Sequence, residues 1–195
     1  MKTAAVFFAD GFEQIEGLSP VDFLRRAGVE VTTVGVKGKS FEDKMIVTSS
    51  HQVPIITDTT LDAFLDAMNG EVPDCVVCPG GAVGAENLGA CEKLLDFLEK
   101  CFEKGVLTCA ICASPAVVFG KTNILDGKKW TCYPNMEGCA KSEFVSGYID
   151  DVFVVDENVV TARGPGASEQ FSMQIVKMLC GGEVFEKISK GALLR

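Results

Sequence analysis

Short apolar runs that alternate with helix-like segments constrain the fold of this chain most strongly. Each run suits one buried strand, and the segments between the runs carry helical periodicity or helix start and stop residues. Such alternation indicates an α/β protein with a mainly parallel sheet and helices on both faces. The expected strands are Thr3–Phe8, Glu30–Val36, Cys75–Cys78, Leu107–Ile111 and a hairpin of Val152–Val155 with Val159–Ala162. The expected helices are one that starts at Ser19-Pro20 and stops before Gly28, Leu61–Met68, Cys91–Lys104 and Ala167–Cys180.

Length and charge narrow the classes of function. With 195 residues the chain is expected to form one domain, residues 1–195, with a substantial core. The net charge of −9 and the pI near 4.7 disfavour nucleic acid and anionic membranes as partners. No apolar run approaches the roughly 20 residues of a membrane span. Asp10 and Glu13 directly follow the N-terminal run, which favours a first strand over a signal peptide.

Four of the nine cysteines form two C-x-x-C pairs, Cys75/Cys78 and Cys109/Cys112. A zinc ribbon needs about 15–20 residues between such pairs, whereas 30 separate them here. Residues three apart on a strand also point to opposite faces. Cys109 lies inside an expected strand, which disfavours a thioredoxin-type site. We therefore expect no metal site, and many reduced cysteines without a secretory signal predict a cytoplasmic protein.

Cys112 lies where the apolar run 107–111 ends and a helix-compatible segment begins. Small residues, Ala110 and Ser114, flank it, and Pro115 suits the first turn of a helix. This is the pattern of a nucleophile elbow with cysteine in place of serine. An elbow exposes its side chain, and a following helix N-terminus would lower the pKa of the thiol, so we expect the most reactive thiol here. A buried structural cysteine is the alternative.

Other candidate site residues follow the expected strands, at the carboxyl edge of the sheet where α/β proteins place their sites. Gly81, in the turn Pro79–Gly84, and Ala113 would offer backbone N–H groups as an oxyanion hole. The alternative is a tight turn that needs glycine only for its geometry. Glu13 and Glu16 would shuttle protons beside a cysteine, or would simply favour a helix start.

His51 is the only histidine, and it lies in the polar stretch Ser49–Gln52. A solvated side chain is the simplest interpretation, because no local feature brings His51 to Cys112. Arg163 begins the segment Arg163–Gly166 before the last helix. This segment would bind an anion at the helix terminus or form a tight turn.

Taken together, these segments resemble the ThiJ/PfpI superfamily, and most closely its branch that contains the human Parkinson-disease-associated deglycase. The matching segments occur in family order across nearly the whole chain. They are Gly11–Glu16, Pro20–Gly28, Pro79–Leu88, Ala110–Pro115 and Arg163–Gly166. The resemblance implies a flavodoxin-like three-layer sandwich with a mainly parallel central sheet, like that of class I glutamine amidotransferases.

The resemblance also implies roles for individual residues. Cys112 falls on the family nucleophile, Glu16 on the glutamate that hydrogen-bonds it, and Gly81 and Ala113 on the backbone N–H donors. The protease branch carries histidine directly after its cysteine, so Ala113 at that position disfavours a peptidase. In the human protein a histidine also precedes the proline of a later segment, and Tyr133 stands there in this chain.

The resemblance further implies a homodimer. His51 falls where the human protein has an arginine near the dimer interface, so we expect His51 and Arg26 near the partner's pocket. Tyr133 and Arg163 are the other expected pocket residues.

These expectations favour a cofactor-independent enzyme of the glyoxalase III or deglycase kind. It would act on methylglyoxal, glyoxal or their early glycation adducts, with Cys112 as nucleophile and Glu16 as proton carrier. The alternative is an oxidative-stress sensor or protective chaperone in which Cys112 is reversibly oxidised. A third interpretation is a binding protein that keeps the elbow without its chemistry. The expected partner is a small reactive aldehyde, not nucleic acid or a membrane.

Overall fold

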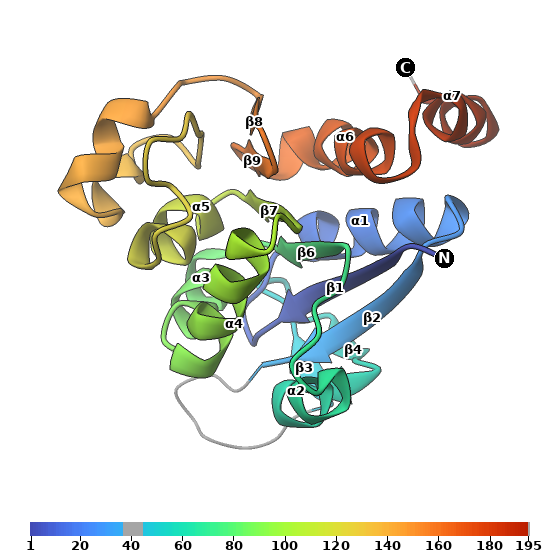
Figure 1. Cartoon of the computed structure of the whole chain (residues 1–195), viewed down its shortest axis with the longest axis horizontal. Coiled ribbons are helices and arrows are strands. Elements are labelled where there is room, and N and C mark those ends of the chain that lie inside the picture. Colours follow the sequence, from blue (N-terminus) through green and yellow to red (C-terminus); the bar gives the residue numbers. More distant parts are fainter. Residues whose placement is uncertain (37–44, 195) are drawn as a thin grey trace.

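A seven-stranded sheet lies at the centre of the computed structural model, which describes residues 1–36 and 45–194 (Figure 1). Its strands are β1 (Thr3–Phe8), β2 (Glu30–Gly35), β5 (Thr59–Thr60), β6 (Cys75–Cys78), β7 (Leu107–Ile111), β8 (Phe153–Asp156) and β9 (Val159–Ala162). The strand order is β5-β2-β1-β6-β7-β9-β8. All neighbouring strands are parallel except β8 and β9. The expected mainly parallel α/β sheet is confirmed.

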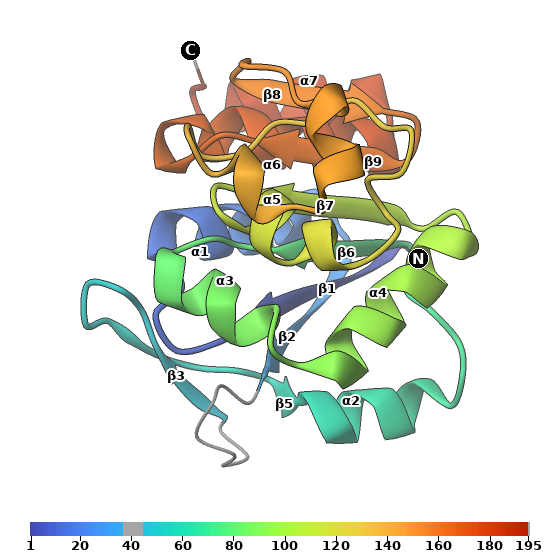
Figure 2. The ribbon, with the colours of Figure 1, turned by 90° about the vertical axis from the view of Figure 1, so that its left-hand side faces the viewer.

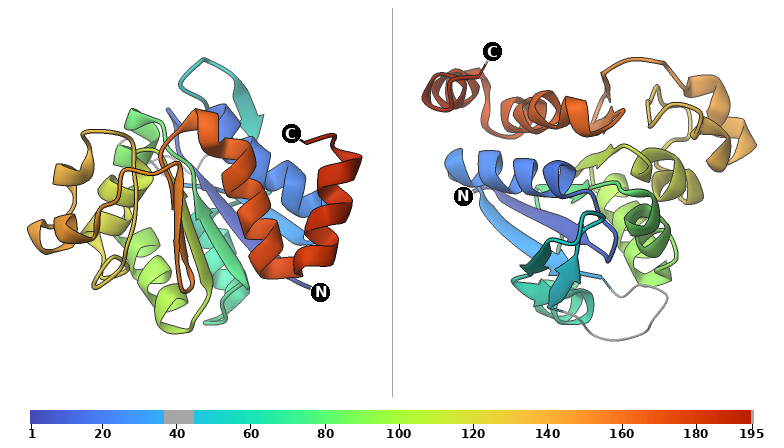
Figure 3. Two further views of the ribbon diagram at one scale, coloured as in Figure 1. Left: turned by 90° about the horizontal axis from the view of Figure 1, so that it is seen from above. Right: turned by 180° about the vertical axis from the view of Figure 1, so that it is seen from behind.

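Helices cover both faces of this sheet. They are α1 (Gln14–Arg26), α2 (Leu61–Met68), α3 (Ala82–Leu88), α4 (Glu92–Glu103), α5 (Ser114–Val117), α6 (Ser168–Cys180) and α7 (Gly182–Gly191), with 3-10 turns at Phe119–Lys121, Glu137–Cys139, Ser142–Gly147 and Pro165–Ala167. One core lies under α1, α6 and α7, and α1 and α6 lie side by side (Figure 3). The other core lies under α2, α3, α4 and α5 (Figure 2). Within the described ranges, no helix has both the length and the apolar character to cross a membrane.

Two consecutive phenylalanines on β1 show how the sheet separates these cores. Phe7 makes edge contacts with Phe64 and Phe97 at ring-centroid distances of 6.0 and 6.1 Å. Phe8 points to the opposite face and packs on Phe12 at 4.9 Å. Fully burying one such side chain stabilises a fold by roughly 1.5–3 kcal/mol. Alternation along one strand therefore builds both hydrophobic layers of the sandwich.

Helix α1 begins at Gln14, so the expected helix start around Pro20 is wrong. Pro20 lies inside the helix, where a proline removes one backbone hydrogen bond and costs about 3 kcal/mol. Packing of the buried residues in the first turns of α1 against the sheet offsets this cost. Gly17 fits tightly there, because a Cβ added to it would lie 2.5 Å from the Phe8 ring. The early start places Glu16 in the first turn of α1.

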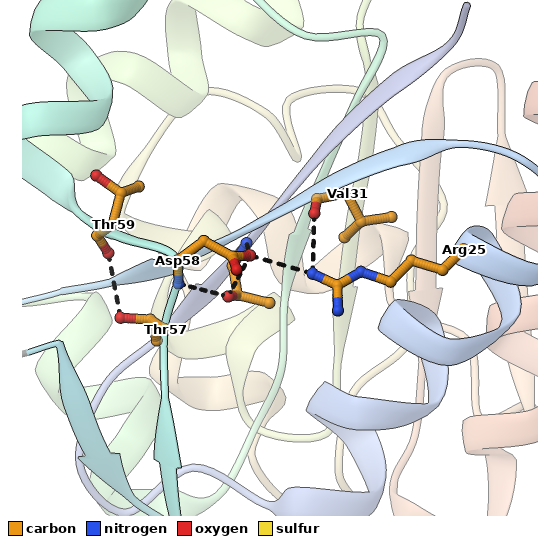
Figure 4. A network of polar contacts seen from close by, with 6 residues as sticks. Arg25, Val31, Thr57, Asp58 and Thr59 are labelled. Carbon is orange, nitrogen blue, oxygen red and sulfur yellow. Dashed lines mark hydrogen bonds and ion pairs between the residues drawn. The ribbon is translucent and has the colours of Figure 1, made fainter.

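A network of polar contacts ties the end of α1 to the sheet (Figure 4). Arg25 Nη2 donates to the carbonyl of Val31 and to Asp58 Oδ2, both at 3.1 Å. The same Asp58 oxygen accepts the amide and the hydroxyl of Thr33 at 2.8 and 2.7 Å. Partial burial raises the pKa of Asp58, but these donors outweigh burial and hold the pKa below its ordinary value. The network thus fixes the segment that leads into β5 and α2.

Two short strands have no recognisable pattern in the sequence and were not predicted from it. β3 (Ile46–Thr48) and β4 (Pro54–Ile56) form a separate antiparallel hairpin, and strands of three residues are too short to show a periodicity.

The cysteines lie as the sequence predicts. All nine are free thiols, and Cys75 and Cys78 belong to opposite cores, as residues three apart on a strand should.

Candidate active site

Cys112 occupies a sharp turn between β7 and α5. Its φ of +66° lies in the left-handed region, which is uncommon for residues other than glycine. Its amide donates to the Ala162 carbonyl at 2.8 Å, and its carbonyl accepts the Tyr133 amide at 2.7 Å. Two neighbouring segments therefore hold this strained backbone, and such strain clusters at functional sites. The strand, turn and helix expected around Cys112 are all present.

Glu16 reaches the elbow from the first turn of α1. The residue is 0% exposed, and its Oε2 accepts the Gly80 amide at 3.0 Å. A Cβ added to Gly80 would lie 2.5 Å from Cys112 Cβ and 2.6 Å from Glu16 Oε2. Oε1 is buried and makes no well-formed hydrogen bond to the described residues. Glycine at position 80 allows the Glu16 carboxyl group and the Cys112 side chain to lie this close together.

The backbone amides of Gly81 and Ala113 lie close enough to Cys112 to lower the pKa of its thiol. Gly81 has a φ of +88°, and a Cβ added there would lie 2.3 Å from a backbone carbonyl oxygen. This turn therefore needs glycine. Ser114 Oγ donates to the Pro79 carbonyl at 2.6 Å, which ties the start of α5 to the same turn. The structure thus brings together the four residues that the sequence singled out most strongly.

Burial raises the pKa of both reactive groups. Desolvation raises the pKa of Glu16 to about 7, while hydrogen bonds from Cys112 and Gly80 act in the opposite direction. Desolvation also raises the pKa of Cys112 to about 12. A charged Glu16 adds to this rise, and the Gly81 and Ala113 amides oppose it.

The expectation that the elbow exposes Cys112 and lowers its pKa is therefore wrong. The residue is only 8% exposed, and helix α5 comprises only four residues, too few for a strong dipole. Cys139 is the exposed cysteine. The main cause of the raised pKa of Glu16 is burial rather than a neighbouring thiolate.

Glu16 and Cys112 are close enough to titrate as a pair, so their pKa values belong to both groups together. One proton leaves near pH 7 and the second near pH 12, and between these values the pair carries a single negative charge. The Gly81 and Ala113 amides stabilise this charge on sulfur, and the Gly80 amide stabilises it on the carboxylate. A proton can thus pass between oxygen and sulfur within one site.

Comparison with known proteins identifies the family. Residues 2–178 match the DJ-1/PfpI family. The chain belongs to this family. It is 36% identical over 194 residues to Protein dj-1beta of Drosophila melanogaster, covering 99% of this chain and 97% of that protein. The structure of Toxoplasma gondii DJ-1 in its oxidized form is similar with a TM-score of 0.87 at 31% identity, covering 99% of this chain and 98% of that one.

A more distant relative bears on chemistry. The Glutathione-independent glyoxalase DJR-1.2 of Caenorhabditis elegans is 28% identical over 181 residues, which cover 91% of this chain and 88% of that protein. The DJ-1/PfpI family therefore includes glyoxalase-type enzymes. The expected membership of the ThiJ/PfpI superfamily is confirmed, and so is the expected three-layer sandwich with a mainly parallel sheet.

Two of the expected pocket residues border the elbow in this DJ-1/PfpI member. The Tyr133 amide bonds to the Cys112 carbonyl, and its ring would lie 3.5 Å from a Cβ added to Gly164. Tyr133 is 48% exposed. Arg163 directly follows β9, and its half-exposed side chain lies 4.0 Å from Asp150.

The other two make no hydrogen bond or ion pair with Cys112 or Glu16 within this subunit. Arg26 is at the end of α1 opposite Glu16, paired with Asp22 at 2.6 Å. The His51 side chain is 68% exposed and contacts its own loop and the start of α1. A contribution of His51 and Arg26 to a partner's pocket stays a prediction.

The sequence did not reveal the roles of Gly80 and Ser50. A glycine pair after a strand signals a close approach, but it does not say that the Gly80 amide holds Glu16. Ser50 donates to Glu13 Oε2 at 3.0 Å, because the β3–β4 hairpin returns to the end of β1. No local pattern indicates that return.

A hollow with a volume of about 980 Å³ lies beside the site. The Asp10–Gly11 turn, the hairpin and the start of α3 line it, and Cys112 does not. Residues 1–36 and 45–194 contain no group of three or more histidine, cysteine, aspartate or glutamate side chains that could hold a metal ion.

Replacing Glu16 by glutamine is expected to flatten the pH dependence of stability. The folded-state pKa of about 7 lies above the ordinary 4.5, so the folded state binds this proton more tightly. The resulting stability is fully present below pH 4.5 and is lost as the pH rises through 7. Its size is about 3 kcal/mol at about 1.4 kcal/mol per unit. Urea unfolding of both proteins across this range measures the difference.

The matched control is Glu103→Gln, a substitution of an exposed glutamate at the end of α4. It should keep the pH slope of the wild type. If Glu16→Gln keeps that slope as well, the carboxyl of Glu16 does not retain its proton near neutral pH.

Proposed function

We propose that this protein is a cofactor-independent glyoxalase that converts methylglyoxal or glyoxal, or their early adducts with amines and thiols, into hydroxy acids. The observation that carries this proposal is the meeting of the Glu16 carboxyl and the Gly81 and Ala113 amides at the Cys112 sulfur. A nucleophile, a proton carrier with a pKa near 7 and fixed N–H donors are what proton transfer between adjacent carbons needs.

The first half of the reaction forms a thioester. The Cys112 thiolate adds to the aldehyde carbon, and protonated Glu16 donates its proton to the new oxyanion, which gives a hemithioacetal. The Glu16 carboxylate then removes the proton from this carbon, the hydroxyl proton moves to the neighbouring oxygen, and Glu16 returns its proton to the neighbouring carbon. The Gly81 and Ala113 amides stabilise the negative charge on oxygen.

The second half is hydrolysis, in which water releases the hydroxy acid and restores the Cys112–Glu16 pair. The name of the nematode relative, a glutathione-independent glyoxalase, supports this chemistry through family membership. A cysteine–histidine peptidase lacks support, because Ala113 follows Cys112 and His51 is the only histidine.

The direct test supplies purified protein with methylglyoxal in the absence of glutathione, after dialysis against a chelator. Loss of the dicarbonyl with stoichiometric appearance of the 2-hydroxy acid in the NMR spectrum supports the proposal. Absence of the acid at high enzyme concentration contradicts it.

A second candidate function is redox sensing, and the same donors favour it. A Cys112 sulfinate would accept hydrogen bonds from the Gly81 and Ala113 amides and from protonated Glu16. Toxoplasma gondii DJ-1 is known in an oxidized form. Peptide mapping after dilute peroxide tests the sensor function, which requires oxidation of Cys112 ahead of the exposed Cys139.

Nine free thiols suit a reducing compartment, so we also propose a cytoplasmic location.

We also propose a homodimer, supported by exposed apolar side chains on α1 and the adjoining β3–β4 hairpin. They are Ile15, Leu18, Ile46, Val53 and Ile56, each at least 38% exposed. The hairpin adjoins α1 through the bond from the Ser50 amide to the Phe12 carbonyl at 2.8 Å. A symmetric interface would cover this surface with the same surface of a second copy.

The double substitution Ile15→Asp, Ile56→Asp is expected to weaken the dimer at least about 100-fold. Each buried isoleucine contributes roughly 1.5–3 kcal/mol, and two-fold symmetry counts each change twice. Sedimentation at micromolar concentration measures the shift. Val155→Asp, on an exposed position of β8, is the control that should stay dimeric. A monomeric wild type would rule the dimer out.

A further inference from the structure

We propose that Glu13 is a second catalytic carboxylate of this site. It acts as the general base that activates water for hydrolysis of the Cys112 thioester, and Ser50 and His51 hold it in position. The inference rests on the glyoxalase chemistry proposed above and assigns its last step.

Glu13 and Cys112 lie on the two sides of the Gly80–Gly81 turn. The Glu13 amide donates to the Gly80 carbonyl at 2.9 Å, and a Cβ added to Gly81 would lie 2.7 Å from that amide nitrogen. On the other side, a Cβ added to Gly80 would lie 2.5 Å from Cys112 Cβ. Burial is the main cause of the raised pKa of Glu16, and the charge of Glu13 adds to it, so Glu13 acts on the same site.

Ser50 and His51 converge on one oxygen of the Glu13 carboxylate. Ser50 Oγ donates to Oε2 at 3.0 Å, and His51 Nδ1 lies 3.4 Å from the same oxygen. His51 Nδ1 also lies 3.1 Å from Ser50 Oγ and 3.3 Å from Gln14 Oε1. The Ser50 amide is fixed to the Phe12 carbonyl at 2.8 Å. The contacts of Ser50 and His51 with Glu13 both involve Oε2, so Oε1 is the oxygen that we assign to the incoming water.

Glu16 and Glu13 differ in their access to solvent. Glu16 is 0% exposed, and its Oε2 is occupied by the Gly80 amide. The Glu13 side chain is 13% exposed and the His51 side chain 68% exposed. A base that moves a proton between two carbons must keep that proton from solvent, whereas a base for hydrolysis must meet incoming water. The buried carboxyl suits the first task and the partly exposed one suits the second.

The hydrolytic step balances with these groups. The water oxygen bonds to the thioester carbon as Glu13 Oε1 takes one water proton. The tetrahedral intermediate then collapses, the carbon–sulfur bond breaks and Cys112 leaves as thiolate. The hydroxy acid ionises at neutral pH. Of the two water protons, one restores the Cys112–Glu16 pair and the other passes from Glu13 Oε1 to solvent water.

Glu13→Gln is expected to stop the reaction after the thioester forms. The amide keeps an oxygen that accepts the Ser50 hydroxyl but cannot take a proton. Steady-state turnover of methylglyoxal should therefore fall at least about 100-fold, while Cys112 gains the mass of one methylglyoxal in quenched samples. Hydroxylamine, added after excess methylglyoxal is removed, attacks thioesters without a base and should release the adduct as a hydroxamate. The isomeric hemithioacetal expected in Glu16→Gln would form no hydroxamate.

Ser50→Ala is the second variant, in case Glu13→Gln does not fold. It should accumulate the same adduct with a turnover loss of about 10-fold, and Ser50→Thr should restore turnover. Glu103→Gln is the matched surface control. Turnover of Glu13→Gln within two-fold of the wild type overturns the role of Glu13, and so does lost turnover without a hydroxylamine-sensitive adduct. A wild type that forms no hydroxy acid refutes the glyoxalase function itself, and the role of Glu13 with it.

Discussion

Cys112→Ser is expected to abolish methylglyoxal turnover, with a loss of about 1,000-fold or more. Serine is nearly isosteric with cysteine, so the elbow, the amides and Glu16 should stay in place. Its hydroxyl is far less acidic than a thiol, and a carboxyl with a pKa near 7 is too weak a base to ionise it. Initial rates of dicarbonyl loss, measured with thermal unfolding on the same samples, check this result.

Cys139→Ser is the matched control, because Cys139 is the exposed cysteine and lies outside the site. It should retain turnover within two-fold of the wild type. Substantial turnover by Cys112→Ser would mean that the observed chemistry does not pass through the elbow sulfur, and the proposed mechanism would then be wrong.

The second large effect is expected for Gly80→Ala. The new methyl group would lie 2.5 Å from Cys112 Cβ, 2.6 Å from Glu16 Oε2 and 2.9 Å from the Ile111 carbonyl. Something must move, and overpacking of this kind costs roughly 1–3 kcal/mol. Because the carboxyl and the thiol would be forced apart, turnover should fall about 100-fold. Steady-state kinetics and urea unfolding measure the two effects separately.

Gly138→Ala provides the control, since a Cβ at Gly138 meets nothing within 4 Å. It should leave both turnover and stability unchanged. If Gly80→Ala retains wild-type turnover despite the close contacts, the reaction does not depend on the approach of Glu16 to Cys112.

Local patterns predicted much of the scaffold. Thr3–Phe8, Cys75–Cys78 and Leu107–Ile111 form strands with the expected bounds, and Leu61–Met68 forms the expected helix. These segments are short and apolar, or amphipathic, so burial and local preference favour the same structure. The predicted start of α1 was wrong, because the pattern around Pro20 resembles a helix start while tertiary packing extends the helix back to Gln14.

The candidate site, like the fold, was predicted only in part from the sequence. The small residues around Cys112 predict an elbow, and the structure contains one. The same residues suggested an exposed thiol of low pKa, but the pKa depends on how much water reaches the sulfur and on the charge of Glu16. No local pattern predicts the access of water to the sulfur or the nearby charge, since Glu16 comes from a distant segment.

By itself, the sequence determined that this chain forms a mainly parallel α/β sheet with a cysteine elbow at the end of one strand. These features depend on residues close together in the chain. Only the tertiary structure decided what surrounds the cysteine. The carboxyl ends of β1, β6 and β7 are adjacent in the sheet, which brings Glu16, the Gly80–Gly81 turn and Cys112 to one point. Desolvation and charge at that point set the proton affinity of the site, and both fall off with distance in space rather than along the chain.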